Sequence, residues 1–214
     1  MLKFTPEQGD LLDYFPTSTG ITLVHAGAGT GKTFIAKQLV EAIQPNSGLY
    51  VAFNKAIVLE GEQTFEHLNV EASTWHKLAR SYVKNQPNID VNDISDISYS
   101  CIKEKIKYSD KAIVIDAINM FYVSASTDME EFMEDFYYEN EKLKLLSLKY
   151  ITKMIDGEIS PSFNFLLKYF HLMLVESTVE CKYDLVILDE INDTTAVALE
   201  IFKLIDAPRK LGLG

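Results

Sequence analysis

The 214-residue sequence lacks several features that would place it in a class at once. It has only two cysteines, Cys101 and Cys181, whose separation fits neither a disulfide framework nor a metal-ligand spacing. It has no apolar run of membrane-spanning length, and its polar N-terminus does not resemble a secretory leader. Repeats and low-complexity tracts are also missing. We therefore expect a cytoplasmic protein with free thiols and no association with membranes.

Basic residues are in the minority. The chain has 20 lysines and arginines against 31 aspartates and glutamates, a net charge of −11. This balance argues against a large non-specific grip on nucleic acid, but it leaves room for a local basic groove. Apolar residues make up 47% of the chain, and its length suits one α/β domain or one domain with an insertion.

Apolar segments alternate with helical patterns near both ends of the sequence, an order that predicts an α/β fold with a parallel sheet and helices on its faces. The expected strands are residues 21–24, 49–53, 70–73, 184–190 and 210–214. The expected helices are residues 5–15, 31–44, 54–65, 74–83 and 194–205.

The middle of the chain has a different character. After the polar stretch 85–88, the pattern predicts helices over 99–107, 110–124, 128–136, 140–155 and 161–176. Residues 90–160 hold 15 acidic and eight basic side chains. The densest acidic cluster consists of Asp128, Glu130, Glu131, Glu134, Asp135, Glu139 and Glu141. Such a cluster is typical of a solvated helix face, and the alternative is a surface that repels nucleic acid or meets a basic partner.

A phosphate-binding loop follows the first strand. Residues 26–33 read Ala-Gly-Ala-Gly-Thr-Gly-Lys-Thr, which matches G-x-x-x-x-G-K-[ST] except that Ala26 replaces the first glycine. Glycines let backbone N–H groups turn toward nucleotide phosphates, Lys32 adds a positive charge, and the Thr33 hydroxyl can bind Mg²⁺. The residues expected to bind the phosphates are Ala26, Gly27, Ala28, Gly29, Thr30, Gly31, Lys32 and Thr33.

A second motif, Leu185-Val186-Ile187-Leu188-Asp189-Glu190, is an apolar strand that ends in two carboxylates. In open α/β sheets, strand-end carboxylates lie at the edge where ligands bind. We expect Asp189 to hold Mg²⁺ through its water shell and Glu190 to orient and deprotonate an attacking water. Lys32 and Glu190 are therefore the predicted catalytic residues, and Thr33 and Asp189 the predicted metal ligands.

These motifs, together with three further segments, resemble the ATP-binding half of UvrD/Rep-type superfamily 1 DNA helicases. The further segments are Phe4-Thr5-Pro6-Glu7-Gln8, Val51-Ala52-Phe53-Asn54-Lys55-Ala56 and Ser73-Thr74-Trp75-His76-Lys77-Leu78-Ala79. Within this family, the sequence Tyr50-Val51-Ala52-Phe53-Asn54-Lys55 most resembles the F-box-helicase branch. The resemblance implies a RecA-like P-loop domain over residues 1–86 and 180–214, with an all-helical subdomain inserted over 87–179.

The resemblance also implies ligands and roles. ATP and Mg²⁺ would be the cofactors, and Gln8 would read the adenine edge by hydrogen bonds. Single-stranded DNA would contact Phe53, Asn54, Lys55, Thr74, Trp75 and His76. Considered without the resemblance, Phe53, Trp75 and His76 could equally be packing residues, and Asn54 could be a helix N-cap.

Two departures from the family pattern limit what the resemblance implies. Asn192 stands where the family has a glutamine that connects the nucleotide and DNA sites. The chain also ends before the second RecA-like domain, which supplies arginines for catalysis. We therefore expect a chain that binds Mg·ATP, hydrolyses it slowly at best, binds single-stranded DNA weakly and does not unwind duplexes.

Two other functions are compatible with the same motifs. One is a stand-alone P-loop regulator that binds a host replication or recombination protein through the acidic helical insertion. The other is a P-loop kinase or other small NTPase, a reading that leaves Gln8 unexplained and lacks an acceptor-site motif.

Overall fold

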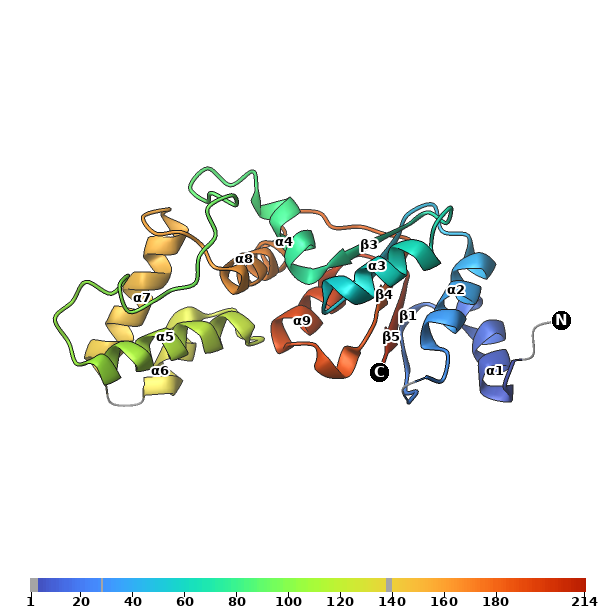
Figure 1. The fold of residues 1–214 in the computed structure, drawn as a ribbon, viewed down its shortest axis with the longest axis horizontal. Coiled ribbons are helices and arrows are strands. Elements are labelled where there is room, and N and C mark those ends of the chain that lie inside the picture. The colour runs from blue at the N-terminus through green and yellow to red at the C-terminus, as the bar shows by residue number, and fades with distance from the viewer. Residues whose placement is uncertain (1–3, 28, 138–139) are drawn as a thin grey trace. The chain divides into compact units, whose positions relative to one another are not determined.

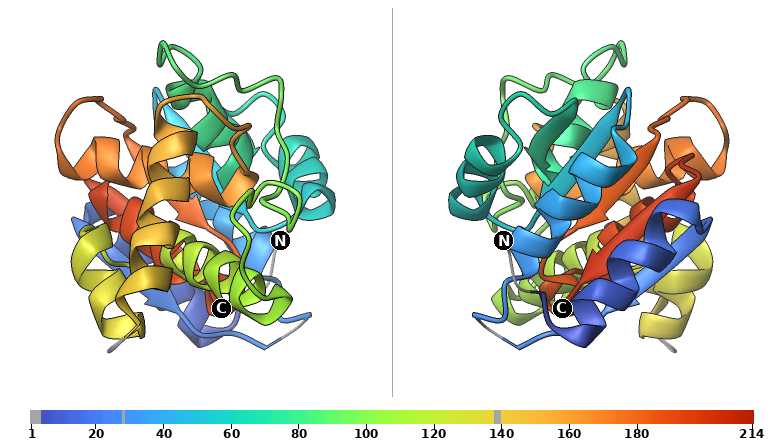
Figure 2. Two further views of the ribbon diagram at one scale, coloured as in Figure 1. Left: turned by 90° about the vertical axis from the view of Figure 1, so that its left-hand side faces the viewer. Right: turned by 90° about the vertical axis from the view of Figure 1, so that its right-hand side faces the viewer.

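Five parallel strands form one sheet in the computed structural model, which describes residues 4–27, 29–137 and 140–214 (Figure 1). Across the sheet the order is β1 (Gly20–Val24), β5 (Arg209–Leu213), β4 (Leu185–Leu188), β2 (Gly48–Ala52) and β3 (Val70–Thr74). Every neighbouring pair is parallel, and β4 and β5, orange and red, can be followed side by side in Figure 2. The predicted α/β class and all five predicted strands are confirmed.

Two compact units divide the chain. The sheet unit contains residues up to Trp75 together with Glu180–Thr194 and Phe202–Gly214. The helical unit contains His76–Val179 together with Thr195–Ile201.

The helices of the sheet unit begin with recognisable caps. Its elements besides the strands are α1 (Pro6–Tyr14), α2 (Lys32–Ile43), α3 (Lys55–Thr64) and the 3₁₀ turns η1 (Phe15–Thr17) and η2 (Ile191–Asp193). Thr5 and Gln8 form a reciprocal capping box at α1, and the Asn54 side chain accepts a hydrogen bond from the backbone of Ile57 at α3.

One hydrophobic cluster of the sheet unit covers one face of the sheet. Alternate residues of the strands, including Tyr50, Ile187 and Leu211, point to this face and pack against α2 and α3. Leu39 of α2 and Phe15 of η1 complete the cluster and are fully buried. This packing holds the carboxyl ends of the strands at one edge of the sheet.

The helical unit is built from α5 (Tyr108–Val123), α6 (Met129–Tyr137), α7 (Glu141–Ile155), α8 (Phe163–Val175) and all but the first residue of α4 (Trp75–Val83). Helix α9 (Ala196–Leu204) is divided between the two units. Within the helical unit, α5 contacts α6, α7 and α8. Among the described residues, no helix is both long and apolar enough to cross a bilayer.

The helix predicted over 99–107 is wrong, because this segment consists of turns and irregular backbone. Isolated turn contacts join some of its backbone groups, such as the Ile106 N–H and the Glu104 carbonyl at 3.0 Å, and side chains outside the segment bind others. The Lys103 N–H donates to the Tyr150 hydroxyl at 2.8 Å, and Lys111 Nζ donates to the Ile102 carbonyl at 2.5 Å. Ile102 is buried, so packing holds the segment in a form that leaves no regular helical ladder.

Candidate nucleotide-binding site

The motifs predicted from sequence meet at one edge of the sheet. Parallel strands end on the same side, so the residues after Val24, Ala52 and Leu188 all emerge there. The glycine-rich loop follows β1, Phe53 and Asn54 follow β2, and Asp189 and Glu190 follow β4. This is the edge at which open α/β folds bind ligands.

Two described residues of the glycine-rich loop have backbone angles that favour glycine. Gly29 and Gly31 have φ angles of +74° and +85°, which favour glycine over any residue with a Cβ. Thr30 Oγ1 donates to the Gly27 carbonyl at 2.7 Å and closes the turn. Helix α2 then begins at Lys32, so the N–H groups of its first turn lack intrahelical acceptors and can bind an anion. Ala28 lies outside the described residues.

A cavity of about 380 Å³ lies between α1 and this loop. Gln8, Ala26, Gly27, Thr30, Gly31 and Lys32 line it, together with Thr5, Glu7, Leu11, Val24, His25 and Ile35. Gln8 Nε2 donates to the Thr30 carbonyl at 3.4 Å, while Gln8 Oε1 accepts from the Thr5 N–H. The predicted adenine reader therefore lies beside the loop, and its amide also holds the start of α1.

Lys32 and Glu190 join the two nucleotide motifs directly. Lys32 Nζ donates to both carboxylate oxygens of Glu190 at 3.1 Å, although 158 residues separate the pair in sequence. The lysine is largely buried and the glutamate is partly exposed. Both side chains belong to the sheet unit, so the loop after β1 and the end of β4 face a common space.

Asp189 is held from two sides. It is only 4% exposed, and its Oδ1 accepts from the Glu190 N–H at 2.9 Å. Its Oδ2 accepts a hydrogen bond from the Tyr50 hydroxyl. Burial, and secondarily the Asp189 carboxylate, raise the pKa of Tyr50, so the hydroxyl keeps its proton and acts as a donor. Sequence reasoning missed Tyr50, because a tyrosine within a buried strand reads as core.

Glu190 itself has an unusual backbone. Its φ and ψ are 52° and 53°, the left-handed region that costs a non-glycine residue about 1 kcal/mol. This turn ends β4 and directs the two adjacent carboxylates differently, one toward Tyr50 and the other toward Lys32.

The donor set fits a magnesium nucleotide. Mg²⁺ takes hard oxygen ligands, keeps several waters and commonly uses one or two protein groups beside the phosphates. The Thr33 hydroxyl and the Asp189 carboxylate offer such oxygens. In the described part of the chain, no group of three or more histidines, cysteines or acids is assembled as a metal cage.

The six residues predicted to contact DNA do not share one environment. Phe53 is 56% exposed, and Asn54 and Lys55 are also exposed at the start of α3. Thr74 is half-buried at the end of β3, whereas Trp75 is only 4% exposed. His76 belongs to the helical unit, where its ring lies 5.6 Å from that of Phe163 and burial lowers its pKa. These positions favour packing for Trp75 and His76.

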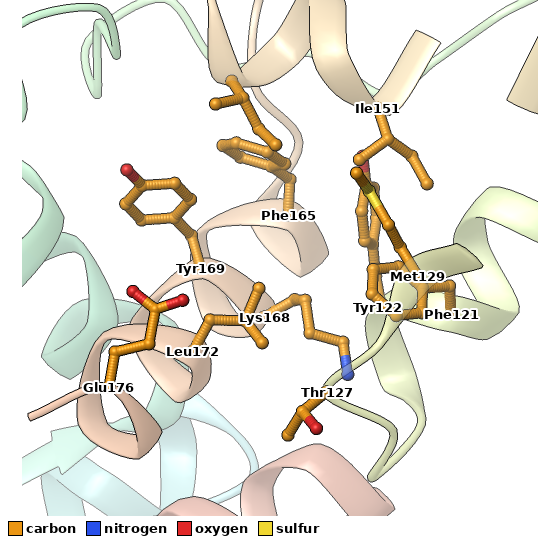
Figure 3. Close-up of a pocket in the computed structure, with 11 residues that line it drawn as sticks. Phe121, Tyr122, Thr127, Met129, Ile151, Phe165, Lys168, Tyr169, Leu172 and Glu176 are labelled. Atoms are coloured by element: carbon orange, nitrogen blue, oxygen red, sulfur yellow. The ribbon is translucent and has the colours of Figure 1, made fainter. Parts of the chain in front are cut away.

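The helical unit has a smaller cavity of about 220 Å³, lined mainly by apolar side chains of α5, α7 and α8 (Figure 3). Lys168 lines it although the residue is buried, and its amine end lies toward Thr127. Lys168 Nζ donates to the carbonyls of Ser124 and Ser126 at 2.9 and 2.6 Å and lies 4.5 Å from the Phe121 ring centre. Burial lowers the pKa of Lys168 to about 8.

The acidic cluster of the insertion lies on and around α6. Asp128 caps this helix by accepting from the backbone of Glu130 and Glu131 at 2.9 and 3.0 Å. Glu131, Glu134 and Glu141 are exposed, and Glu141 pairs with Lys144 at 2.8 Å. Glu139 lies outside the described residues. These local contacts agree with a solvated helix face.

The fold and this site define a P-loop NTPase domain with a RecA-like parallel sheet. The chain belongs to the AAA domain family in its UvrD/Rep-like helicase form, whose model matches residues 16–213.

A comparison with curated proteins gives a relative of the same kind. The chain is 25% identical over 224 aligned residues to F-box DNA helicase 1 of Gallus gallus, and the match covers 94% of this chain. It covers 22% of the relative, so the chain spans about a fifth of that protein's length.

Proposed function

We propose that this chain is the ATP-binding domain of a superfamily 1 DNA helicase, in which ATP hydrolysis drives movement along single-stranded DNA. The contact between Lys32 and Glu190 is the observation on which the proposal rests, because it places the lysine of the phosphate loop beside the candidate catalytic base. The family match and the similarity to a protein named as a DNA helicase support the same conclusion.

Each residue of the site has a role in this proposal. The loop N–H groups from Ala26 to Thr33 hold the phosphates, Lys32 neutralises their charge, and Gln8 contacts the base. Thr33 and Asp189 hold Mg²⁺, which when bound offsets charge on the phosphates. Glu190 orients the attacking water and accepts its proton.

The proposal extends to domains and partners. The RecA-like domain comprises residues 1–86 and 180–214, and the helical subdomain comprises 87–179. Phe53, with its exposed ring, stacks on a base of single-stranded DNA, while Lys55 and Asn54 contact the sugar-phosphate backbone of the DNA. Thr74, at the end of β3, contacts the same strand of DNA. A cytoplasmic location and a protein partner for the acidic insertion remain predictions.

Binding of a fluorescent ATP analogue in the presence of Mg²⁺ tests the nucleotide site. The unmodified chain should bind it, and Lys32→Ala should abolish binding because the charge opposite the phosphates is lost. Lys37→Ala is the matched control, since Lys37 lies on the same helix but does not line the cavity. Undiminished binding by Lys32→Ala would refute the assignment of the loop.

A further inference from the structure

The hydroxyl of Tyr50 reaches the carboxylate of Asp189 because of the strand register. Tyr50 on β2 lies opposite Ile187 on β4, and Asp189 follows two residues later on the same face. The Tyr50 ring extends from this pair toward the carboxyl edge, and its hydroxyl donates to Asp189 Oδ2. A phenylalanine at position 50 would fill the same space without this contact.

Helix α3 holds the Tyr50 ring in place. A Cβ added to Gly61 would lie 2.6 Å from a ring carbon of Tyr50, so only a glycine lets the ring pass. One turn further along α3, at its C-cap, Phe65 packs against the same ring with centroids 5.1 Å apart. Packing of the ring against Gly61 and Phe65 therefore fixes the position of the Tyr50 hydroxyl.

The second oxygen and the backbone of Asp189 are fixed as well. Oδ1 accepts from the Glu190 N–H at 2.9 Å, and the Asp189 N–H donates to the Val51 carbonyl at 2.9 Å. Each carboxylate oxygen has two lone pairs, so both can still accept a hydrogen from metal-bound water. The carboxylate is thus oriented without being used up.

We propose that Tyr50 is a positioning residue that orients Asp189 for magnesium, an inference that rests on the proposed function. Neighbours that hydrogen-bond to a ligating carboxylate commonly set its metal affinity. A tyrosine that only fills the core would affect stability alone. A tyrosine that orients Asp189 would also affect the contribution of magnesium to nucleotide binding.

The test compares dissociation constants of a fluorescent ATP analogue in Mg²⁺ and in EDTA, using the full 214-residue chain. The dissociation constant in EDTA divided by the dissociation constant in Mg²⁺ measures how much magnesium strengthens nucleotide binding. Tyr50→Phe should leave the EDTA constant unchanged and reduce the ratio by roughly tenfold. Tyr122→Phe is the control, because it removes another buried hydroxyl, one that contacts Met154 Sδ at 3.1 Å in the helical unit.

The outcomes separate this inference from the proposed function. Normal binding with an unchanged ratio in Tyr50→Phe would overturn the positioning role and leave the nucleotide site intact. An unmodified chain that binds no nucleotide would overturn both, and one that binds nucleotide equally well in EDTA would overturn the inference about magnesium alone. If Tyr50→Phe does not fold, Gly61→Ala carries the test, since it displaces the ring but keeps the hydroxyl. An unchanged ratio in Gly61→Ala would then refute the inference.

Discussion

Lys32 and Glu190 form an ion pair in this structure, and a bound nucleotide would have to break it. The Glu190 carboxylate and the nucleotide phosphates would both bind the Lys32 ammonium group, so they compete for it. A partly exposed ion pair of this kind contributes about 0.2–1 kcal/mol, a modest barrier that a charged ligand overcomes.

Glu190→Gln separates binding from chemistry. Removing the competing charge should tighten ATP binding about 1.4- to fivefold, by the free energy of such a pair, while phosphate release falls to background because the base is gone. Titration with the fluorescent analogue and a phosphate-release assay measure the two effects. Glu41→Gln, an exposed position on α2, should change neither. Weaker ATP binding by Glu190→Gln would contradict this account of the ion pair.

The residues of the site differ in how well sequence could predict them. Lys32, Asp189 and Glu190 could be named because their motifs tie residue type to spacing along one strand or loop. Tyr50 could not, because its role depends on the register between β2 and β4 and on the missing Cβ at Gly61. Sequence likewise could not predict that Trp75 is buried and Phe53 exposed, because both are aromatic residues at strand ends and their burial depends on neighbouring segments.

At the scale of elements, periodicity predicted the strands and most helices, and it failed over 99–107. This short segment was expected to be helical, yet the side chains of Tyr150 and Lys111 each bind one of its backbone groups. Contacts formed between distant segments therefore outweighed a weak local preference. In the sheet unit, glycine marks the start of α2, asparagine the start of α3, and threonine followed by proline the start of α1.

Lys168 provides an element-scale prediction. Its amine bonds to carbonyls that follow the end of α5, so Lys168→Met leaves two acceptors without this donor. The free energy of unfolding should fall by about 1–3 kcal/mol, measured by urea denaturation, with ATP affinity unchanged. Lys142→Met, an exposed change on α7, is the control. Unaltered stability of Lys168→Met would argue that the amine is not a structural cap.

A net charge of −11 confines the proposed contact with single-stranded DNA to a local surface of the protein. We expect single-stranded DNA affinity, measured by fluorescence anisotropy of a labelled oligonucleotide, to be weak and salt-dependent. Phe53→Ala should weaken it about tenfold through lost stacking. Tyr14→Ala removes another exposed aromatic of the sheet unit and should have little effect. Equal losses in both variants would exclude a specific role for Phe53.

The close fit of Tyr50 against Gly61 also constrains how related chains can diverge. A larger residue at position 61 displaces the Tyr50 ring unless position 50 becomes smaller, and neither a displaced ring nor a smaller residue places a hydroxyl at the carboxylate after β4. The two positions should therefore change together among relatives. Lineages that keep the tyrosine should keep the glycine, and lineages that lose one should have found another donor for the aspartate.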